Sequence, residues 1–511
     1  MILDTSTVDE DVSLRSDACV IGSGAGGSVV ARELAAGGMD VVLIEEGGYW
    51  TSRDFTQLEE EMYPRLYRER GTRPTSDFSV LVSQGRALGG STLVSFCLCF
   101  RPPSPVLSSW AERTGIEALA PAGFLPAVER VERSLPVRRM GADHLNANNR
   151  ILKTGGERLG LRGRFLDHNR TDCLGCGYCA LGCAYDRKND AIVTYLADAS
   201  HRGARILPWA RADRVLYEGR EARGVVGRFL RSRTGARRSF RVDARVVVIA
   251  GGALESPMLW LRSSLPNPGG VVGRHLRLNP YVVVAGIFDE RVATWEGVPQ
   301  SWVVDEFLDP VRFPQGGLLF FSASAQPIAC AGLLPGFGWE HRRGMHDVSR
   351  MAMIAVFLND RAEGHVSLGR RGEAVIRYEL GGDDQVEVKR GLRLASEMLF
   401  AAGAERVVLP YNDLVELAKP EDARVIDERG IFANDPLFLS FHPQGTLRIG
   451  AVPRRSVVGR GGESHEVRGL YVADASVLPG AVGVPPQVSI MAFATETARA
   501  ILGTLPARLG S

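Results

Sequence analysis

The chain has 511 residues, of which 45% are hydrophobic and 58 are glycine, so it can bury a large core divided between two or three packed modules. Its 61 basic and 59 acidic side chains leave a net charge of +2, which excludes a global field that would attract nucleic acid or an anionic membrane. No run approaches the roughly 18 apolar residues of a membrane span and the acidic N-terminus lacks a secretory signal, so we expect a cytoplasmic protein without disulfides.

The first predicted elements are a strand, a tight turn, a helix and a second strand within about 30 residues. The first strand is the apolar run from Asp17 to Ile21. The helix is "SVVARELAAGG", which ends at Gly37 and Gly38, and the second strand is "DVVLIE". This order is the context in which a glycine-rich turn predicts a dinucleotide site.

The turn between the first strand and the helix carries the pattern G-x-G-x-x-G. Gly22 permits a sharp turn, Gly24 lets the backbone approach a pyrophosphate, and Gly27 lets the helix pack on the strand. The helix N-terminus offers free N–H groups to an anion, and Glu45 ends the second strand where it can accept hydrogen bonds from ribose hydroxyls. The residues expected to bind the cofactor here are Gly22, Gly24, Ala25, Gly26, Gly27 and Glu45. The motif alone does not decide between FAD and NAD.

Further α/β signals occur in the middle and at the end of the chain. "ARVVVIAGG" from Ala244 predicts a strand that leads into a helix, and "GLYVADASVLPG" from Gly469 repeats the strand pattern before an amphipathic helix from Gln487. Between them, residues 286–375 show little helical periodicity and predict a mostly β module, followed by one long helix from Asp384 that ends at Gly403. We therefore infer a discontinuous cofactor domain with a second domain inserted into it.

Four blocks stand in a consistent order around these elements: "GRALGGSTLVSFCLCFRP" from Gly85, "IAGGALESPMLWLRSS" from Ile249, "FHPQGTLRIG" from Phe441 and "LYVADASVLPGAVGVPPQVSIMAFA" from Leu470. Together they resemble the glucose-methanol-choline (GMC) oxidoreductases, and the resemblance extends from residue 17 to residue 502. The last block is similar to cholesterol oxidases, and a cysteine-rich block described below resembles long-chain alcohol oxidases.

The resemblance implies an α/β fold with a doubly wound, Rossmann-like FAD-binding domain and an inserted substrate domain built on an antiparallel sheet. We expect the FAD-binding domain at 1–100, 190–285 and 436–511, a cysteine-bearing insertion at 101–189 and the substrate-binding domain at 286–435. The implied activity is oxidation of the CH–OH group of a small-molecule alcohol. The low charge density of the inserted segment favours an uncharged or apolar substrate.

The resemblance also assigns cofactor contacts to individual residues. It places Gly85, Gly89, Gly90 and Ser91 along the flavin and pyrophosphate, the backbone of Val215 at the adenine, and Asp474 near the ribityl and pyrophosphate region. The helix that begins near Gln487 would point its positive end at the flavin N1–C2=O edge. No histidine stands in the first glycine block, where some family members attach their flavin, so we expect non-covalent FAD.

His442, in "HPQGT", matches the active-site histidine of the family. An imidazole suits removal of the hydroxyl proton while hydride moves to flavin N5, because its pKa lies near neutral pH. The second polar group of the family aligns with Pro485, whose side chain neither donates nor accepts a hydrogen bond. Either His442 acts alone, or another residue substitutes, with Gln487 the nearest polar candidate, or the reaction is not simple alcohol oxidation.

"CLGCGYCALGC" places Cys173, Cys176, Cys179 and Cys183 at C-x2-C-x2-C-x3-C, a spacing like that of bacterial ferredoxins. An iron–sulfur cluster ([4Fe-4S] or [3Fe-4S]), free thiols, zinc and a disulfide stay open as alternatives. A cluster would pass electrons to a protein partner or a quinone, and without one oxygen or a soluble acceptor is favoured. Cys19, Cys97, Cys99 and Cys330 stand in apolar contexts and are expected to be buried.

Two other functions remain open from the sequence. A flavin enzyme could reduce or desaturate a carbon framework with electrons that enter through the cysteine site. Alternatively, a flavin-binding protein could have lost catalysis together with the polar group at Pro485 and serve as an electron relay.

Overall fold

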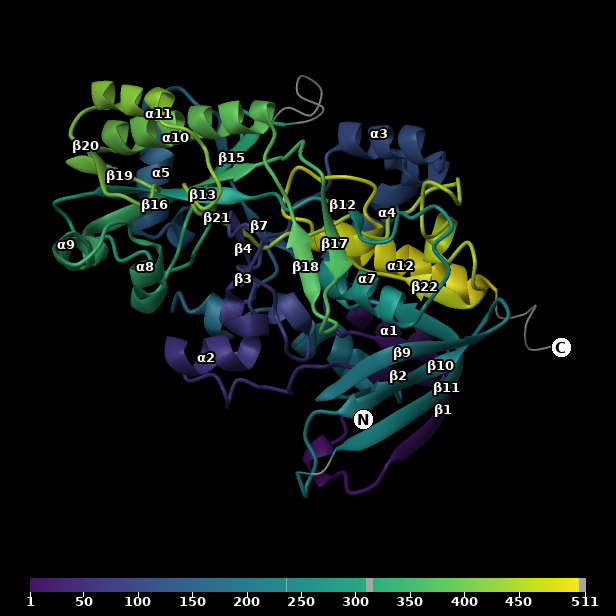
Figure 1. The fold of residues 1–511 in the computed structure, drawn as a ribbon. Coiled ribbons are helices and arrows are strands. Elements are labelled where there is room, and N and C mark those ends of the chain that lie inside the picture. The colour runs from purple at the N-terminus through teal and green to yellow at the C-terminus, as the bar shows by residue number, and fades with distance from the viewer. Residues whose placement is uncertain (236, 309–315, 505–511) are drawn as a thin grey trace.

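The computed structural model describes residues 1–235, 237–308 and 316–504 (Figure 1). One sheet carries the four predicted strands of the cofactor domain, β1 (Val12–Ile21), β2 (Val41–Ile44), β11 (Arg238–Ile249) and β22 (Leu470–Val472), together with β8 (Arg205–Leu207), β9 (Ala210–Glu218) and β10 (Glu221–Phe229), which the sequence did not indicate. Their order is β8-β2-β1-β11-β10-β9, with β22 also paired to β11. β8, β2, β1, β11 and β22 run parallel, whereas β10 and β9 form an antiparallel extension.

Helices from both ends of the chain pack beside this sheet: α1 (Ala25–Ala36), α3 (Ser104–Thr114), α4 (Pro121–Ser134), α6 (Ala197–His201), α7 (Gly252–Arg262) and α12 (Gln487–Gly503). α1 packs on β1, β2 and α12, and α4 packs on the other side of α12 (Figure 1). The Phe124 and Phe493 rings, 4.8 Å apart between centroids, join α4 to α12. The strand–turn–helix–strand unit predicted at the N-terminus is confirmed, although β1 begins earlier than the apolar run at Asp17.

A second sheet occupies the opposite end of the molecule: β3 (Arg73–Pro74), β4 (Val80–Val82), β6 (Gly163–Phe165), β13 (Tyr281–Ile287), β14 (Trp302–Val304), β15 (Leu318–Ser322), β16 (Met351–Leu358), β19 (Arg406–Leu409), β20 (Val415–Leu417) and β21 (Phe438–Ser440). Its order is β3-β4-β21-β13-β16-β15-β14-β6, with β19 paired to β13 and β20 to β19. All pairs are antiparallel except β4 with β21.

The long helix predicted from Asp384 is α10 (Gly382–Ala402), which packs on α5 (Ala147–Arg158) and on the second sheet. It ends where Gly403 adopts a φ of 105°, a left-handed conformation that glycine accepts without a steric penalty. The remaining elements are α2 (Glu59–Leu66), α8 (Pro327–Leu333), α9 (Trp339–Asp347), α11 (Val425–Glu428), β5 (Arg138–Arg139), β7 (Asp167–His168), β12 (Arg274–Leu276), β17 (Gly364–Leu368) and β18 (Ala374–Arg377).

The predicted α/β architecture is therefore present, with a Rossmann-like sheet and a second, largely antiparallel sheet. Sheet membership does not follow the expected segment boundaries, because β3, β4, β6 and β21 join the second sheet from segments assigned elsewhere. The segment 286–375 contains β strands as predicted, but also the helices α8 and α9.

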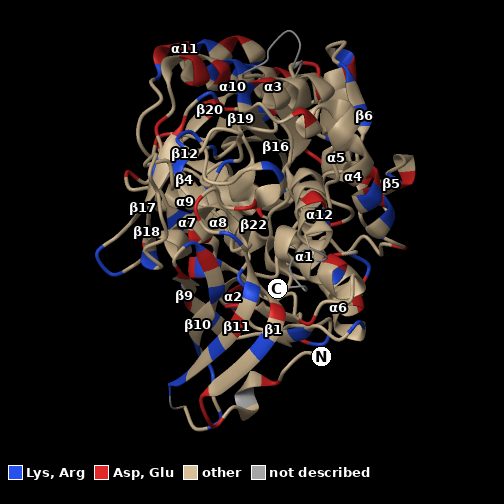
Figure 2. Cartoon of the chain, turned by 90° about the vertical axis from the view of Figure 1, so that its right-hand side faces the viewer, with Lys and Arg blue, Asp and Glu red and all other residues tan. Residues whose placement is uncertain are grey.

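Basic and acidic residues are interspersed along the elements rather than gathered on one of them (Figure 2), which agrees with the balanced net charge. Within the part of the chain that the structure describes, no helix combines the length and the apolar character needed to cross a membrane.

Candidate active site

A cleft of about 1210 Å³, counted with its open mouth, lies at the carboxyl ends of β1, β2, β11 and β22. This end of a parallel sheet is where doubly wound folds bind their ligands. The cleft brings together ten of the residues predicted from sequence: Gly22, Gly24, Ala25, Gly26, Glu45, Gly85, Gly90, Ser91, His442 and Asp474. Residues from both termini and from the block that begins at Gly85 therefore meet at one site.

The glycine turn is built for close approach of the backbone. Gly22 has a φ of 99°, and a Cβ added there would lie 2.3 Å from the carbonyl oxygen of Ala250. A Cβ on Gly26 would lie 1.7 Å from the carbonyl oxygen of Ala473. Gly24 differs, since a Cβ there would meet no described atom closer than 3.9 Å. The fold itself thus requires Gly22 and Gly26, whereas Gly24 leaves open space at the start of α1.

Gly27 and Gly89, both predicted to contact the cofactor, shape the turn from outside the cleft. A Cβ on Gly27 would lie 1.9 Å from the carbonyl oxygen of Gly22, so this residue sets how closely α1 packs on β1. Gly89 has a φ of 90° and donates its N–H to Ser23 Oγ at 2.9 Å. Ser23 therefore links the turn from Gly22 to Gly27 to the block that begins at Gly85.

Three other predicted contacts also lie outside the set of residues that lines the cleft. Val215 is buried and donates its N–H to Ser263 Oγ at 2.9 Å. From the same strand, β9, the cleft is lined instead by residues 210–212. In the loop before α12, Pro486 lines the cleft, and Pro485 and Gln487 do not.

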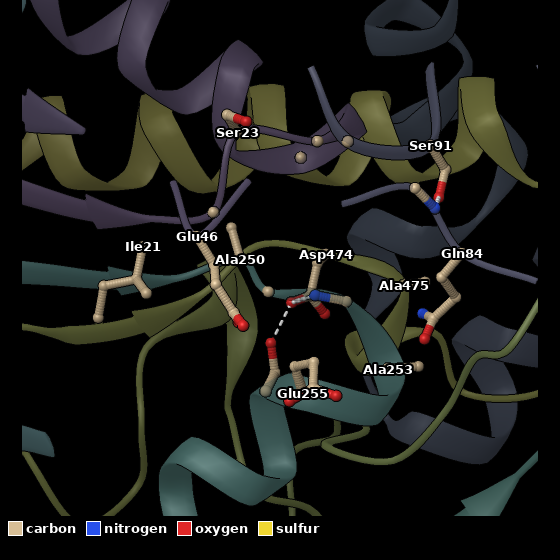
Figure 3. Close-up of a pocket in the computed structure, with 18 of the residues that line it drawn as sticks. Ile21, Ser23, Glu46, Gln84, Ser91, Ala250, Ala253, Glu255, Asp474 and Ala475 are labelled. Atoms are coloured by element: carbon tan, nitrogen blue, oxygen red, sulfur yellow. Dashed lines mark hydrogen bonds between the residues drawn. The ribbon is translucent and has the colours of Figure 1, made fainter. Parts of the chain in front are cut away.

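Two buried carboxylates hold the walls of the cleft together. Glu45 accepts hydrogen bonds from Ser23 Oγ at 2.6 Å and from the Gly47 N–H at 2.7 Å. Asp474 accepts from the Gly252 N–H at 2.8 Å and from the Ser256 hydroxyl (Figure 3). Burial raises the pKa of both carboxyls, although these donors oppose the rise. Glu45 Oε1 has a single donor and can accept a further hydrogen bond, as the predicted contact with a ribose hydroxyl would need. Asp474 also accepts from the N–H and the hydroxyl of Ser476, so each of its two oxygens already has two donors.

An ion-pair network that the sequence did not indicate also borders the cleft. Arg68 contacts Glu46 at 2.8 Å and Glu255 at 3.6 Å, and Arg73 contacts Glu255 at 2.8 Å. Burial would raise the pKa of Glu255, but the two guanidinium groups hold it at about 2. Glu255 lies within a block quoted above, whereas Arg68 and Arg73 belong to a segment without any motif.

His442 follows β21 and faces the cleft beside Phe441. Its ring centroid lies 5.7 Å from that of Phe357, and its Nδ1 atom is buried without a hydrogen-bond partner. Burial lowers the pKa of His442 from 6.5 to about 4. The imidazole is therefore neutral near pH 7 and can accept a proton.

The residues of the cleft fit the predicted flavin nucleotide. The open space at Gly24 lies at the N-terminus of α1, where N–H groups attract a pyrophosphate. Arg262 Nε and Gln84 Oε1 are buried polar atoms without a partner at the same cleft, and such atoms cost free energy unless a ligand or water satisfies them. Gln84 was not predicted from sequence, and no motif marks it.

The four clustered cysteines line a separate small pocket of about 390 Å³, together with Cys97. Among the described residues, no group of three or more His, Cys, Asp or Glu side chains is arranged to hold a metal ion. The Cys97 and Cys179 side chains line this pocket together, and Arg170 Nη1 donates to Cys173 Sγ at 3.4 Å. The structure thus gives no support to the predicted iron–sulfur cluster or to zinc. Cys97 is buried as predicted, but it belongs to this thiol cluster.

Two family profiles described as GMC oxidoreductase match residues 63–281 and 360–494 of the chain. An uncharacterized GMC-type oxidoreductase of Mycobacterium tuberculosis is 35% identical over 502 residues, which cover 96% of this chain and 76% of that protein. The long-chain-alcohol oxidase FAO4B of Arabidopsis thaliana is 30% identical, over 95% of this chain and 67% of its own length.

Solved structures share the fold at lower sequence identity. Pyridoxine 4-oxidase from Mesorbium loti superposes with a TM-score of 0.71 at 19% identity, covering 95% of this chain and 98% of its own. A formate oxidase of Aspergillus oryzae RIB40, studied for its FAD modification, superposes with a TM-score of 0.74 at 16% identity, covering 98% and 100%. At these identities the likeness establishes the fold.

Proposed function

The chain belongs to the GMC oxidoreductase family, and from that premise we propose that it is an FAD-dependent enzyme that oxidises the CH–OH group of an uncharged or apolar alcohol. The observation that carries the proposal is the position of His442. A neutral imidazole with an unpartnered Nδ1 faces the same cleft as the glycine turn that would hold the cofactor.

The residues of the chain supply binding and proton transfer. The N–H groups at the start of α1 and the glycines around Gly24 would hold the pyrophosphate, and Asp474 would order the wall of the cleft next to the ribityl region through its bonds to Gly252, Ser256 and Ser476. When bound, the flavin supplies the acceptor for hydride from the carbinol carbon. His442 accepts the hydroxyl proton on a ring nitrogen, because the low pKa keeps the imidazole unprotonated.

The walls next to His442 support an uncharged substrate. Phe441, Pro443, Pro486 and Ile490 line this part of the cleft and offer no charge. A charged alcohol would lose its hydration there without a paired group in return. The similarity to a long-chain-alcohol oxidase of Arabidopsis thaliana points to the same substrate class.

We propose oxygen or a soluble acceptor as the electron acceptor, because the cysteine loop shows no arrangement for a metal centre within the described residues. An acceptor protein or a quinone is the alternative. The rate at which oxygen and a soluble quinone reoxidise the alcohol-reduced protein distinguishes the two. Oxygen that fails to reoxidise it at any useful rate contradicts this part of the proposal.

The main test is reduction of the flavin by alcohols in the absence of oxygen. FAD-loaded protein is mixed with primary alcohols of increasing chain length and with a quaternary ammonium alcohol, and flavin bleaching is followed by absorbance. We expect uncharged alcohols to bleach the flavin, and His442→Gln to slow bleaching by roughly 10²- to 10⁴-fold, the usual contribution of a general base.

His365→Gln serves as the matched control, because His365 is exposed on β17 and does not line the cleft. It should bleach like the wild type. The proposal fails if no alcohol bleaches the wild-type flavin, or if His442→Gln is bleached as fast as the wild type.

A further inference from the structure

Five cysteines meet in the pocket of about 390 Å³ that the proposed reaction does not use. Cys97 belongs to the block that begins at Gly85, and the other four cysteines belong to the segment between β7 and α6. All five are free cysteines; Cys97 is buried, whereas the other four are half-buried. A small solute that enters the pocket can therefore meet thiols from two distant parts of the chain.

The Lys188 side chain fastens these two parts of the chain to each other. Lys188 is buried, and its Nζ atom donates to the carbonyl oxygen of Cys179 at 2.7 Å and to that of Ser95 at 2.9 Å. Ser95 precedes Cys97 by two residues. One ammonium group thus holds the backbone at Cys179 next to the backbone that carries Cys97, and the two side chains line the same pocket.

The Arg170 side chain makes a second link and brings another positive charge to the thiols. It is buried, and it donates from Nη2 to the Phe96 carbonyl oxygen at 2.8 Å and from Nη1 to Cys173 Sγ at 3.4 Å. Positive charge beside a cysteine favours the thiolate, which is the form that reacts with oxidants. Arginine and lysine side chains in one pocket with several thiols therefore make a site where a cysteine can be oxidised.

Cys97 and Cys179 are suited to different roles in such an oxidation. The Cys97 side chain and the two basic side chains lower the pKa of Cys179 well below its usual value, although burial opposes them. Burial raises the pKa of the Cys97 thiol. Cys179, which is also the more exposed of the two, is therefore the residue that meets an oxidant first.

We propose that Cys97 and Cys179 form a redox-active pair that hydrogen peroxide converts into a disulfide. The Cys179 sulfur attacks one oxygen of the peroxide, the O–O bond breaks, and the other oxygen leaves as water with the proton of the thiol. Cys179 is then a sulfenic acid. The Cys97 sulfur attacks it, the S–O bond breaks, and the second oxygen leaves as water with the Cys97 proton. The two thiols together lose two electrons, which reduce the peroxide.

The proposed function offers a source of the oxidant. If oxygen accepts the electrons of the oxidised alcohol, hydrogen peroxide is released at the same protein. The inference does not rest on that source, because peroxide from elsewhere would react in the same way.

The test maps the disulfides of the flavin-containing protein after it has been reduced with dithiothreitol, freed of it and treated with hydrogen peroxide. Remaining thiols are alkylated and the protein is digested with trypsin, which releases Cys97 in the peptide 87–113 and Cys179 in the peptide 171–187. We expect these two peptides to be joined after peroxide and separate after a second reduction. Thiol titration of the denatured protein should find two fewer thiols than the eight of the reduced chain.

Substitutions identify the two sulfurs. Cys97→Ala and Cys179→Ala should each abolish the joined peptides, and in Cys97→Ala the sulfenic acid should be trapped by dimedone at Cys179. Cys99→Ala is the matched control, because Cys99 lies in the same peptide as Cys97 and is also buried but does not line the pocket. It should form the joined peptides like the wild type. The wild-type map tests the proposal by itself if a variant fails to fold.

Several results would overturn the proposal. They are a peroxide-treated wild type without joined peptides, a disulfide confined to the peptide 171–187, and joined peptides that persist in Cys97→Ala or Cys179→Ala. Iron and sulfide bound by the purified protein would also overturn it, because the cysteines would then be cluster ligands. If no alcohol bleaches the flavin but the joined peptides form, the proposed function fails and the redox-active pair stands.

Discussion

Replacement of Gly24 by alanine separates the role of this glycine in the fold from its role in the cofactor site. Gly24 has a φ of −67° and a ψ of −160°, a conformation that alanine adopts without strain. The nearest described atom to an added Cβ lies 3.9 Å away, an ordinary van der Waals distance. The folded protein therefore has room for the methyl group, and only a ligand would compete with it.

The magnitudes follow from that geometry. Alanine restricts the unfolded chain, so Gly24→Ala should stabilise the apoprotein by about 0.4–1 kcal/mol. In the cleft, the methyl group would displace a pyrophosphate from the N–H groups at the start of α1. One lost hydrogen bond to a charged group costs about 1.5–3 kcal/mol, which corresponds to a rise in the FAD dissociation constant of roughly 10- to 100-fold.

Two assays measure these effects separately. Apoprotein freed of flavin is titrated with FAD, followed by quenching of flavin fluorescence, and its unfolding in denaturant is followed by circular dichroism. Gly332→Ala is the matched control, because Gly332 lies in α8 with no described atom within 4 Å of an added Cβ and does not line the cleft. The control should show a similar gain in stability and unchanged FAD affinity.

Either of two results would refute the reasoning. FAD affinity in Gly24→Ala equal to that of the wild type means that nothing occupies the space at Gly24. A loss of apoprotein stability in this variant means that the fold, and not the cofactor, requires the glycine. Gly26→Ala cannot make this distinction, since its Cβ would lie 1.7 Å from the Ala473 carbonyl oxygen and the fold itself would have to shift.

Three further predictions concern the charged and titratable groups. Burial holds the pKa of His442 at about 4, so the rate of flavin reduction should stay constant as the pH falls to about 5. The rate should decline only below that pH, because the imidazole then becomes protonated and can no longer accept a proton. A decline with a midpoint near pH 6.5 in the pH–rate profile contradicts this prediction. Arg68→Met should leave the partly buried Glu255 with one cation fewer and lower the free energy of unfolding by about 1–3 kcal/mol, measured by denaturant titration, whereas Arg139→Met at an exposed ion pair should cost under about 1 kcal/mol. Anaerobically purified protein should contain flavin but neither iron nor acid-labile sulfide. Elemental analysis that finds iron and sulfide in stoichiometric amounts contradicts this prediction and shows that the four clustered cysteines bind an iron–sulfur cluster.

The strongest sequence predictions concern elements that local pattern determines. The turn from Gly22 to Gly27, the helix after it and the long helix that ends at Gly403 follow from glycine conformation and helical periodicity, which act over a few residues. The family resemblance then identified the remaining blocks, and the cleft unites most of the residues it named. The bounds of the sheets were less predictable, because short strands such as β4 and β21 take their identity from their partners.

The sequence by itself determined that a dinucleotide turn, a histidine motif and a proline in place of a polar group occur in one chain of the GMC family. Only the tertiary structure decided what surrounds them. Packing of distant segments brings Gln84 and His442 to one cleft, Arg68 to Glu255, and Cys97 to Cys179. These contacts join residues far apart along the chain. The local periodicity of the sequence predicts individual helices and strands, but it does not determine which polar side chains come into contact when those elements pack together.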